Sequence, residues 1–277
     1  MPEGHTVHRH ARQQRKELVG HALATDVVQD RFAASAARLD GQVLTDVEAW
    51  GKHLFQTWEG GDVVHVHLGL YGKWRRQPAP PPPMRGAVRL RLVGPTRAWD
   101  LAGATACELL GPDETDAIVA RLGPDPLRPE ADPQRFLDRV ARSRAPIGTL
   151  LLDQTAVAGI GNLYRAEILF LQGIHPERPA RDLRPQEREG LWVETVHQLR
   201  LGLRRGKIVT RRAAEVDVTP SRLPRSEAHY VYHRDTCRVC GGPIRRTELA
   251  ARRIDLCPRC QPRRPRRDHT PPVPPEP

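Results

Sequence analysis

The sequence predicts an α+β protein of several parts: a β-sandwich or barrel with a leading helix, then a helical region, then a metal-held β-hairpin. Three observations predict it. Short β-branched or alternating segments fill the first part of the chain, and apolar residues recur every three or four positions after a Pro-rich connection at 121–132. Four cysteines stand close together near the C-terminus. A chain of 277 residues can hold two domains plus smaller parts.

The first part begins with a helix and continues as strands. Residues 12–19 are predicted to form the helix, which stops at Gly20. The expected strands are 27–32, 42–50, 53–60, 62–70 and 86–94, each bounded by Gly, Asp or Pro. The prolines around 78–83 predict a surface loop. His65 and His67 alternate with valines; they could bind a metal, but packed or surface strand histidines are commoner.

Helical periodicity follows the Pro-rich connection, which is a candidate domain boundary. The expected helices are 133–144, 146–154, 162–173 and 184–206, and a polar, Pro-containing loop is expected at 215–227. Asn162 follows a Gly-rich turn and is predicted to cap its helix. Such a turn can bind an anion, for example a DNA phosphate, or can be an ordinary cap, and the residues leave both open. The Pro-rich tail is expected to be disordered.

The charge of the chain points to a polyanionic partner. Lys and Arg number 44 against 33 Asp and Glu, a net charge of +11. Ten arginines lie from Cys237 to Arg267, against only two acidic residues. Nucleic acid is therefore the first expectation, and a solvated basic face is the alternative. The N-terminus lacks an apolar signal segment, and no run is long enough to span a membrane, so a cytoplasmic protein without a membrane partner is expected.

The four clustered cysteines predict a structural metal site. Cys237, Cys240, Cys257 and Cys260 have the spacing C-x2-C-x16-C-x2-C, which suits one tetrahedral Zn2+ per chain. In a reducing cytosol, zinc is favoured over disulfides or free thiols. Four sulfur ligands leave no position for water, so the metal should hold the fold and not catalyse. The segment between the pairs is expected to form two strands with arginines near their turn. Cys107 stands alone and is expected to be a buried structural residue.

Five stretches of the chain together resemble one family. MPEG at 1–4, AWGKHLF at 49–55, HLGLYG at 67–72, AGIGNLYRAE at 158–167 and CPRCQ at 257–261 occur in the order of the formamidopyrimidine-DNA glycosylase/endonuclease VIII family. The resemblance covers about residues 1–263, and HLGLYG is similar to the endonuclease VIII branch, in particular to its actinobacterial members. It implies an N-terminal catalytic β-sandwich at 1–120, a helix–two-turn–helix domain at 125–220, a zinc finger at 229–263 and a disordered tail at 264–277.

The resemblance also implies catalytic residues. Once Met1 is removed, Pro2 would be the nucleophile that attacks C1′ and forms an iminium. An α-amino group has a pKa of about 7.7–8.0, so a usable fraction is neutral near pH 7, whereas a lysine amine at about 10.4 would need a large shift. Glu3 would be the adjacent general acid/base. Lys52 would contact phosphate or sugar and assist proton transfer, and Arg252 would be the finger-tip arginine that supports δ-elimination.

Further residues match DNA contacts of the family. Leu70 and Tyr71 would fill the gap left by a flipped base, although a core pair at a turn is the alternative. Arg121, Asn162 and Arg253 would contact the DNA backbone, and a one-residue shift between Arg252 and Arg253 is open. The sequence departs from the family at Gly69, where endonuclease VIII commonly has glutamine. It also lacks the Thr and aromatic residues often found before Cys257.

The activity that the resemblance implies is that of a bifunctional DNA glycosylase/AP lyase acting on damaged double-stranded DNA. Oxidised pyrimidines are the first expectation and oxidised purines the second, with strand cleavage by β,δ-elimination. A non-catalytic zinc-finger DNA-binding homologue and, more weakly, an RNA-binding factor are the alternatives. The protein is expected to be a monomer of the bacterial cytoplasm, associated with the nucleoid.

Overall fold

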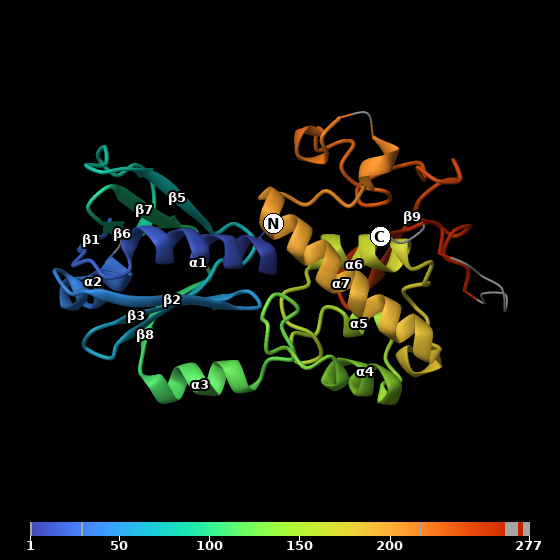
Figure 1. Ribbon diagram of the computed structural model, residues 1–277, viewed down its shortest axis with the longest axis horizontal. Helices are drawn as coiled ribbons and strands as arrows, with labels where there is room; N and C mark the ends of the chain where they lie inside the picture. The colour runs from blue at the N-terminus through green and yellow to red at the C-terminus, as the bar shows by residue number, and fades with distance from the viewer. Residues whose placement is uncertain (1, 29, 217, 264–270, 274–277) are drawn as a thin grey trace. The chain divides into compact units, whose positions relative to one another are not determined.

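The structure is a computed structural model that describes residues 2–28, 30–216, 218–263 and 271–273. It divides into two compact units, Met1–Leu122 and Gly123–Pro277 (Figure 1). Each unit has its own hydrophobic core of buried aliphatic and aromatic side chains. No helix of the described residues is long and apolar enough to cross a membrane.

The first unit holds two antiparallel four-stranded sheets, as the predicted sandwich requires. One has the order β1 (Ala24–Asp26), β6 (Val88–Val93), β7 (Arg97–Ala102) and β5 (Lys73–Pro78). The other has the order β2 (Leu44–Trp50), β3 (His53–Trp58), β4 (Val63–His67) and β8 (Ala106–Leu110). Three helices accompany them: α1 (Gly4–Leu18), α2 (Ala33–Leu39) and α3 (Pro112–Ala120). The strands predicted at 42–50, 53–60, 62–70 and 86–94 are confirmed by β2, β3, β4 and β6.

Two sequence-based expectations for this unit are wrong. The leading helix begins at Gly4 and not at residue 12, because buried His5 and His8 lie among the apolar residues of its first turns and mask the helical pattern. None of the described residues of the predicted strand 27–32 lies in a strand, and Asp30–Phe32 form a 3-10 turn. The side chain of Asp26 accepts a hydrogen bond from Val27 N (2.8 Å), which competes with strand pairing where β1 ends.

Strands β5, β7 and β8 were not foreseen, because their polar residues hide the alternation. β5 is an edge strand, where its last residue, Pro78, costs no ladder hydrogen bond, and the prolines after it lie in a loop as expected. β7 carries Asp100, which is buried because Arg91 of β6 pairs with it at 2.6 and 2.8 Å. Cys107 of β8 is only half-buried, against the core.

The second unit is helical apart from one hairpin. Its helices are α4 (Pro133–Arg142), α5 (Ile147–Leu150), α6 (Asn162–Leu171) and α7 (Pro185–Arg205), and its hairpin pairs β9 (Arg245–Leu249) with β10 (Arg252–Leu256). The helices predicted at 133–144, 162–173 and 184–206 and both strands between the cysteine pairs are confirmed, whereas the helix predicted at 146–154 is a single turn, Ile147–Leu150. Proline stands in the first turn of α4 and of α7, and Gly206 ends α7 with a φ of 72°. The loop after α7 contains 3-10 turns at Ala213–Glu215 and Pro220–Arg222.

The core of the second unit surrounds α6. Residues 163–171 of α6 are all buried, and the core continues through Phe136, Leu191 and Tyr230 to the cysteines of the hairpin. Of the tail predicted to be disordered, residues 264–270 and 274–277 lie outside the described residues. Val273 of the tail is described, and it is buried in this core.

Candidate active site and zinc site

The packing of α1 on β2 brings the start of the chain to the β2–β3 turn. Gly20 N donates to Leu44 O (2.8 Å) where β2 begins, and Arg15 Nε donates to Val47 O (2.9 Å) further along, so helix and strand run in opposite directions. The helix is about 22 Å long and the strand about 23 Å. Pro2 and Glu3 therefore lie at the end of the sheet where β2 turns into β3, as Figure 1 shows for the helix start and the turn.

Glu3 is fully buried and occupies the N-cap position of α1, where its carbonyl accepts from Thr6 N (2.9 Å). The unpaired amides of a helix N-terminus carry a partial positive charge, which disfavours protonation of an amine beside it. Pro2 directly precedes this end. His5 lies in the same environment: burial first, and then neighbouring groups that include His10 and Arg9, lower the pKa of its imidazole to about 3.

Lys52 lies in the two-residue turn that joins β2 to β3. Gly51 takes a φ of 56° there, and Trp50 pairs with His53 across the turn. The pKa of His53 is lowered to about 3 by burial and then by the charges of His65, His67, Arg121 and Lys52. Lys52 also helps to lower the pKa of His67, after burial. Lys52 and Arg121 therefore lie close enough to these histidines for their charges to lower the histidine pKa values.

The HLGLYG loop lies at the same end, because β4 runs antiparallel to β3 and its last residue, His67, pairs with His53. Within the loop, Leu70 is 45% exposed and Tyr71 is 84% exposed. The alternative that these two residues form a core pair is therefore wrong. We define the Lys52 end as this end of the first unit, with the following candidate site residues: Pro2, Glu3, Lys52, Leu70, Tyr71 and Arg121.

Gly69 has a conformation that explains its departure from the family. Its φ is 64°, and a Cβ built there would lie 1.9 Å from Thr105 Oγ1. Gly72, at the other end of the loop, would place a Cβ 2.1 Å from Leu68 O. A glutamine at position 69 would not fit this loop without displacing Thr105. The loop thus presents Leu70 and Tyr71 between two glycines, and a larger residue at either position would force the loop or its neighbours to move.

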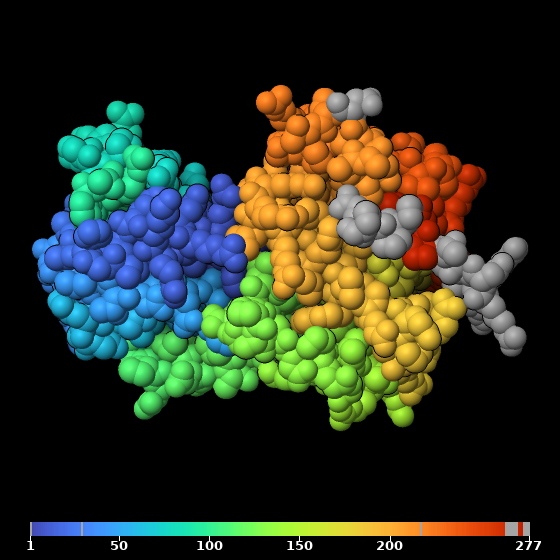
Figure 2. Space-filling model, in the orientation of Figure 1, coloured from blue at the N-terminus to red at the C-terminus, as the bar shows by residue number. Residues whose placement is uncertain are grey.

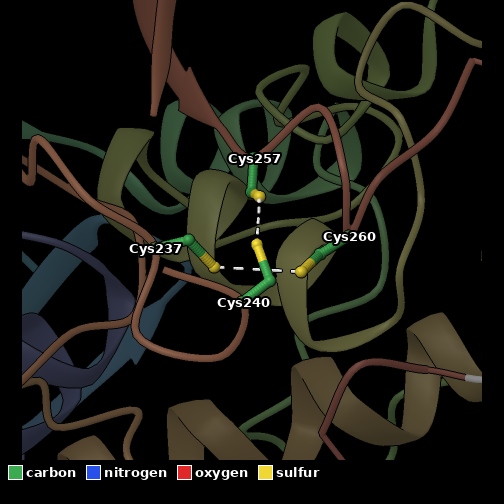
Figure 3. Close-up of side chains that lie close together, drawn as sticks. All are labelled: Cys237, Cys240, Cys257 and Cys260. Atoms are coloured by element: carbon green, nitrogen blue, oxygen red, sulfur yellow. Dashed lines mark hydrogen bonds between the residues drawn. The ribbon is translucent and has the colours of Figure 1, made fainter. Parts of the chain in front are cut away.

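In the second unit the four cysteines converge, as predicted. All four sulfur atoms lie within 4.8 Å of one another, with 3.8 Å between Cys237 and Cys260 and 3.5 Å between Cys240 and Cys257 (Figure 3). A tetrahedron with Zn–S bonds of about 2.3 Å has edges of about 3.8 Å. Burial raises the pKa of the Cys237 thiol to about 11 in the metal-free chain, so zinc must displace its proton on binding. The residues fit one structural Zn2+.

The hairpin above the zinc site separates the two candidate arginines. Arg253 pairs with the buried Asp255 (Nη2 to Oδ1, 2.9 Å). Arg252, whose side chain points to the other face of the strand, is exposed and makes no ion pair or side-chain hydrogen bond with the described residues. The turn before it is formed by Ala250 and Ala251, with φ of 55° and 52°. Arg252 is thus the arginine that the tip of the hairpin leaves available.

The N-cap role predicted for Asn162 is wrong. Gly161 occupies the cap position, and Asn162 is the first helical residue. Its Nδ2 donates to Arg253 O (2.9 Å), and its Oδ1 accepts from Arg165 Nη2 (2.5 Å). Arg165, which is fully buried, also donates to Leu249 O (3.3 Å) and Arg253 O (3.1 Å). The start of α6 therefore holds both strands of the hairpin next to its turn.

Several further polar residues that shape this unit were missed from the sequence. The buried carboxylate of Glu167 accepts from the backbone amides of Tyr230, Val231 and Tyr232 (2.8 Å each) and from the hydroxyl of Thr210 (2.5 Å). It thereby fastens both ends of the loop after α7. Gln261 Nε2 donates to Ile174 O (2.8 Å) and ties the last cysteine turn to the helical core. Their only signal in the sequence was their place inside the AGIGNLYRAE and CPRCQ stretches.

Comparison with known proteins assigns each part of the chain to one kind of protein. Residues 1–101 match the model of the formamidopyrimidine-DNA glycosylase N-terminal domain, residues 122–214 that of its H2TH domain, and residues 235–263 that of the zinc finger found in FPG and IleRS. The chain is 47% identical to Endonuclease 8 1 of Mycobacterium tuberculosis over 267 residues, covering 94% of this chain and all of that protein. It is 37% identical to the formamidopyrimidine-DNA glycosylase of Thermosynechococcus vestitus, covering 78% and 80% of the two chains.

The fold has also been seen in a solved complex. The structure of a mutant Lactococcus lactis FPG with a Fapy-dG containing DNA superposes with a TM-score of 0.79 at 25% identity, covering 94% of this chain and all of that one. Both the order of the parts and the fold of the whole chain therefore agree with these relatives.

Proposed function

The chain belongs to the formamidopyrimidine-DNA glycosylase/endonuclease 8 family of base-excision repair enzymes, and from that premise we propose that it is a bifunctional DNA glycosylase/AP lyase whose nucleophile is Pro2. The observation that carries this proposal is the antiparallel packing of α1 on β2, which brings Pro2 and Glu3 to the turn that holds Lys52. A protein that only bound DNA would have no need of an amine, a carboxylate and a lysine at one end of a sheet.

The proposed reaction begins when the neutral amine of Pro2 attacks C1′ of the damaged nucleotide. The bond from C1′ to the base breaks, the base leaves, and the sugar ring opens to an iminium. Glu3 donates a proton to the opening deoxyribose. The iminium acidifies the C2′ proton, whose loss expels the 3′ phosphate, and a second elimination expels the 5′ phosphate. The positive end of α1 and the charge of Lys52 both favour the neutral amine.

The remaining candidate residues are proposed to hold the DNA. Leu70 and Tyr71 are exposed apolar side chains on a loop fixed by glycines, which suits insertion where a base has been flipped out. Arg121 and Lys52 supply positive charge beside them, for phosphates. In the second unit Arg252 is the proposed finger-tip arginine that supports δ-elimination. Arg253 and Asn162 are proposed to contact the DNA backbone with the N–H donors that their hydrogen bonds within the protein do not use.

The preferred partner is proposed to be damaged double-stranded DNA, bound by a monomer in the bacterial cytoplasm. Oxidised pyrimidines are the proposed lesions, because HLGLYG is similar to the endonuclease VIII branch and the mycobacterial relative carries the name Endonuclease 8. Oxidised purines are the second candidate, since formamidopyrimidine-DNA glycosylases are also similar. Excision from a panel of duplexes, each with one defined lesion, decides between them.

Replacement of Pro2 by glycine tests the nucleophile. We expect the Pro2→Gly variant to lose the covalent complex that borohydride traps between the wild-type protein and damaged DNA, while zinc content and DNA affinity stay unchanged. Mass spectrometry of the same samples reports whether Met1 has been removed. A retained Met1 in an active enzyme would show that Pro2 is not the nucleophile, because the amine of residue 2 would then be part of a peptide bond.

A further inference from the structure

A chain of hydrogen bonds runs from the edge strand β8 across β4 to β3 in the first unit and ends at His53, next to Lys52 in the sequence. His65 Nδ1 lies 2.8 Å from Glu108 Oε1, and His65 Nε2 lies 2.8 Å from His53 Nδ1. The sheet register creates this chain, because His65 pairs with Glu108 across β4 and β8, while His67, two residues on, pairs with His53 across β3 and β4. All of these side chains therefore lie on one face of the sheet.

The directions of the hydrogen bonds follow from the carboxylate. An ionised Glu108 only accepts, so His65 must carry its proton on Nδ1. The Nε2 of a neutral His65 is then an acceptor, and His53 must donate to it from Nδ1. The remaining ring nitrogen, His53 Nε2, is left with a lone pair. His53 Nε2 makes no hydrogen bond to the described residues. It is also not fully buried, in contrast to the unpaired Nδ1 of His10.

The surroundings keep both histidines neutral. Phe55, which is 1% exposed, stacks on His65 with ring centroids 5.1 Å apart, and the His53 and His65 rings are tilted by only 17°. Lys52 of the β2–β3 turn and Arg121 after α3 add positive charge around His53. A proton on His53 would be repelled by both of these, and burial of its ring opposes the charge as well. A neutral imidazole with a fixed tautomer is the result.

We propose that Glu108, His65 and His53 are positioning residues for Lys52: the chain offers the lone pair of His53 Nε2 as the acceptor that holds the Lys52 ammonium group in its working place. This proposal rests on the role of Lys52 in the proposed function. Glu108 is half exposed and His65 is almost fully buried, so the chain links a solvated carboxylate to the Lys52 end through the sheet. It transfers no proton and needs no co-reactant, because its task is to fix one acceptor.

A double-mutant cycle tests the link to Lys52. The rate to measure is single-turnover strand cleavage of a duplex with one abasic site, by the zinc-loaded full-length protein. We expect His53→Phe to slow cleavage about tenfold, and to have no further effect in a Lys52→Met background, because the positioned group is already gone. His21→Phe, an exposed histidine of the same unit, serves as the control and should cleave at the wild-type rate.

Two outcomes of the cycle contradict the proposal in different ways. If the effects of His53→Phe and Lys52→Met multiply, His53 acts independently of Lys52, and the proposed function stands without the positioning chain. If Lys52→Met alone cleaves at full rate, the role of Lys52 in the proposed function fails together with the positioning chain.

The tautomers of His53 and His65 in the wild-type protein provide a test that does not depend on activity or on the folding of a variant. Long-range 15N–1H correlation spectra of the imidazole rings should show His53 and His65 with the proton on Nδ1 at neutral pH. Glu108→Gln, whose amide oxygen still accepts, should keep this tautomer and the cleavage rate. Glu108→Leu should lose the fixed tautomer and slow cleavage as His53→Phe does. A proton on Nε2 of His53 in the wild-type protein would overturn the proposal.

Discussion

The two units of the chain hold their candidate functional groups by different means. In the first unit, a helix and a sheet with an apolar interior end at the same place, and the register of the strands delivers Lys52, His53 and the Leu70–Tyr71 loop there. In the second unit, four cysteines and buried polar residues hold a hairpin that has only two strands. Figure 2 shows the surface of the two units, with the hairpin segment in the orange-red part of the chain.

The stability of the second unit depends more on single residues than that of the first. A two-stranded hairpin is at best marginally stable in water, so the second unit must add bonds that do not come from the sheet. Zinc, Arg165, Glu167 and Gln261 supply them. The first unit distributes its stability over many apolar contacts, so a single change should there alter local geometry more than the fold.

Removal of zinc should have the largest effect, confined to the second unit. Structural zinc contributes about 10–16 kcal/mol in small zinc-binding domains, so Cys257→Ser should abolish zinc binding and unfold the hairpin that carries Arg252. DNA affinity should fall with it, while tryptophan fluorescence should change little, since four of the five tryptophans belong to the first unit. Cys107→Ser is the matched control and should retain one zinc per chain. Zinc retained by Cys257→Ser would contradict the four-cysteine site.

Loss of the Glu167 carboxylate should have the next largest effect. Glu167→Leu leaves three backbone amides without their acceptor, and leaves the Thr210 hydroxyl only its 3.3 Å contact with Ala228 O. An unsatisfied buried group costs about 1–3 kcal/mol, so the free energy of unfolding should fall by at least about 3 kcal/mol. Glu189→Leu, at an exposed position of α7, should change it by less than about 0.5 kcal/mol. Equal denaturation midpoints for the two variants would show that the carboxylate anchors nothing.

Acid should destabilise the first unit through its buried histidines. The pKa values of His5 and His53 are lowered to about 3 and that of His10 to about 4, chiefly by burial. Because the unfolded chain binds more protons below about pH 6.5, stability should be lost progressively as the pH falls from there toward 4. Urea denaturation followed by tryptophan fluorescence measures this, and His10→Phe should make the loss shallower by about one proton. A stability independent of pH in this range would contradict the neutral state of these histidines.

The smallest effect concerns the loop of Leu70 and Tyr71. Gly69→Gln introduces a side chain at positive φ and against Thr105, whereas Gly86→Gln, at a φ of 75° with open space around it, introduces only the backbone strain. Strain of this kind costs roughly 1–3 kcal/mol, and Gly69→Gln should be the more destabilised of the two in thermal unfolding. If the two variants have the same melting temperature, the contact with Thr105 costs no free energy, and the steric explanation for glycine at position 69 is wrong.

Features that depend on residues close together in the sequence could be predicted, and features that depend on distant contacts could not. The Gly51 turn, the apolar spacing of three and four and the spacing of the cysteines are local signals, and they predicted the Lys52 turn, α4 and α7, and the zinc site correctly. The start of α1 was misplaced because His5 and His8 are polar residue types, although the fold buries both of them. The cap assigned to Asn162 failed because its side chain finds partners near Arg253, some 90 positions away, and no local pattern reports such a contact.

By itself the sequence determined the α+β class, the zinc ligands and, through the five stretches it shares with its family, the candidate catalytic residues. These features rest on residue type and short spacing, which the chain carries at every stage of folding. Only the tertiary structure decided that α1 runs against β2, that Arg253 and not Arg252 pairs with Asp255 among the described residues, and that Glu108 reaches His53 through His65. Those depend on strand register and on contacts between distant segments, which exist only once the core has brought the segments together.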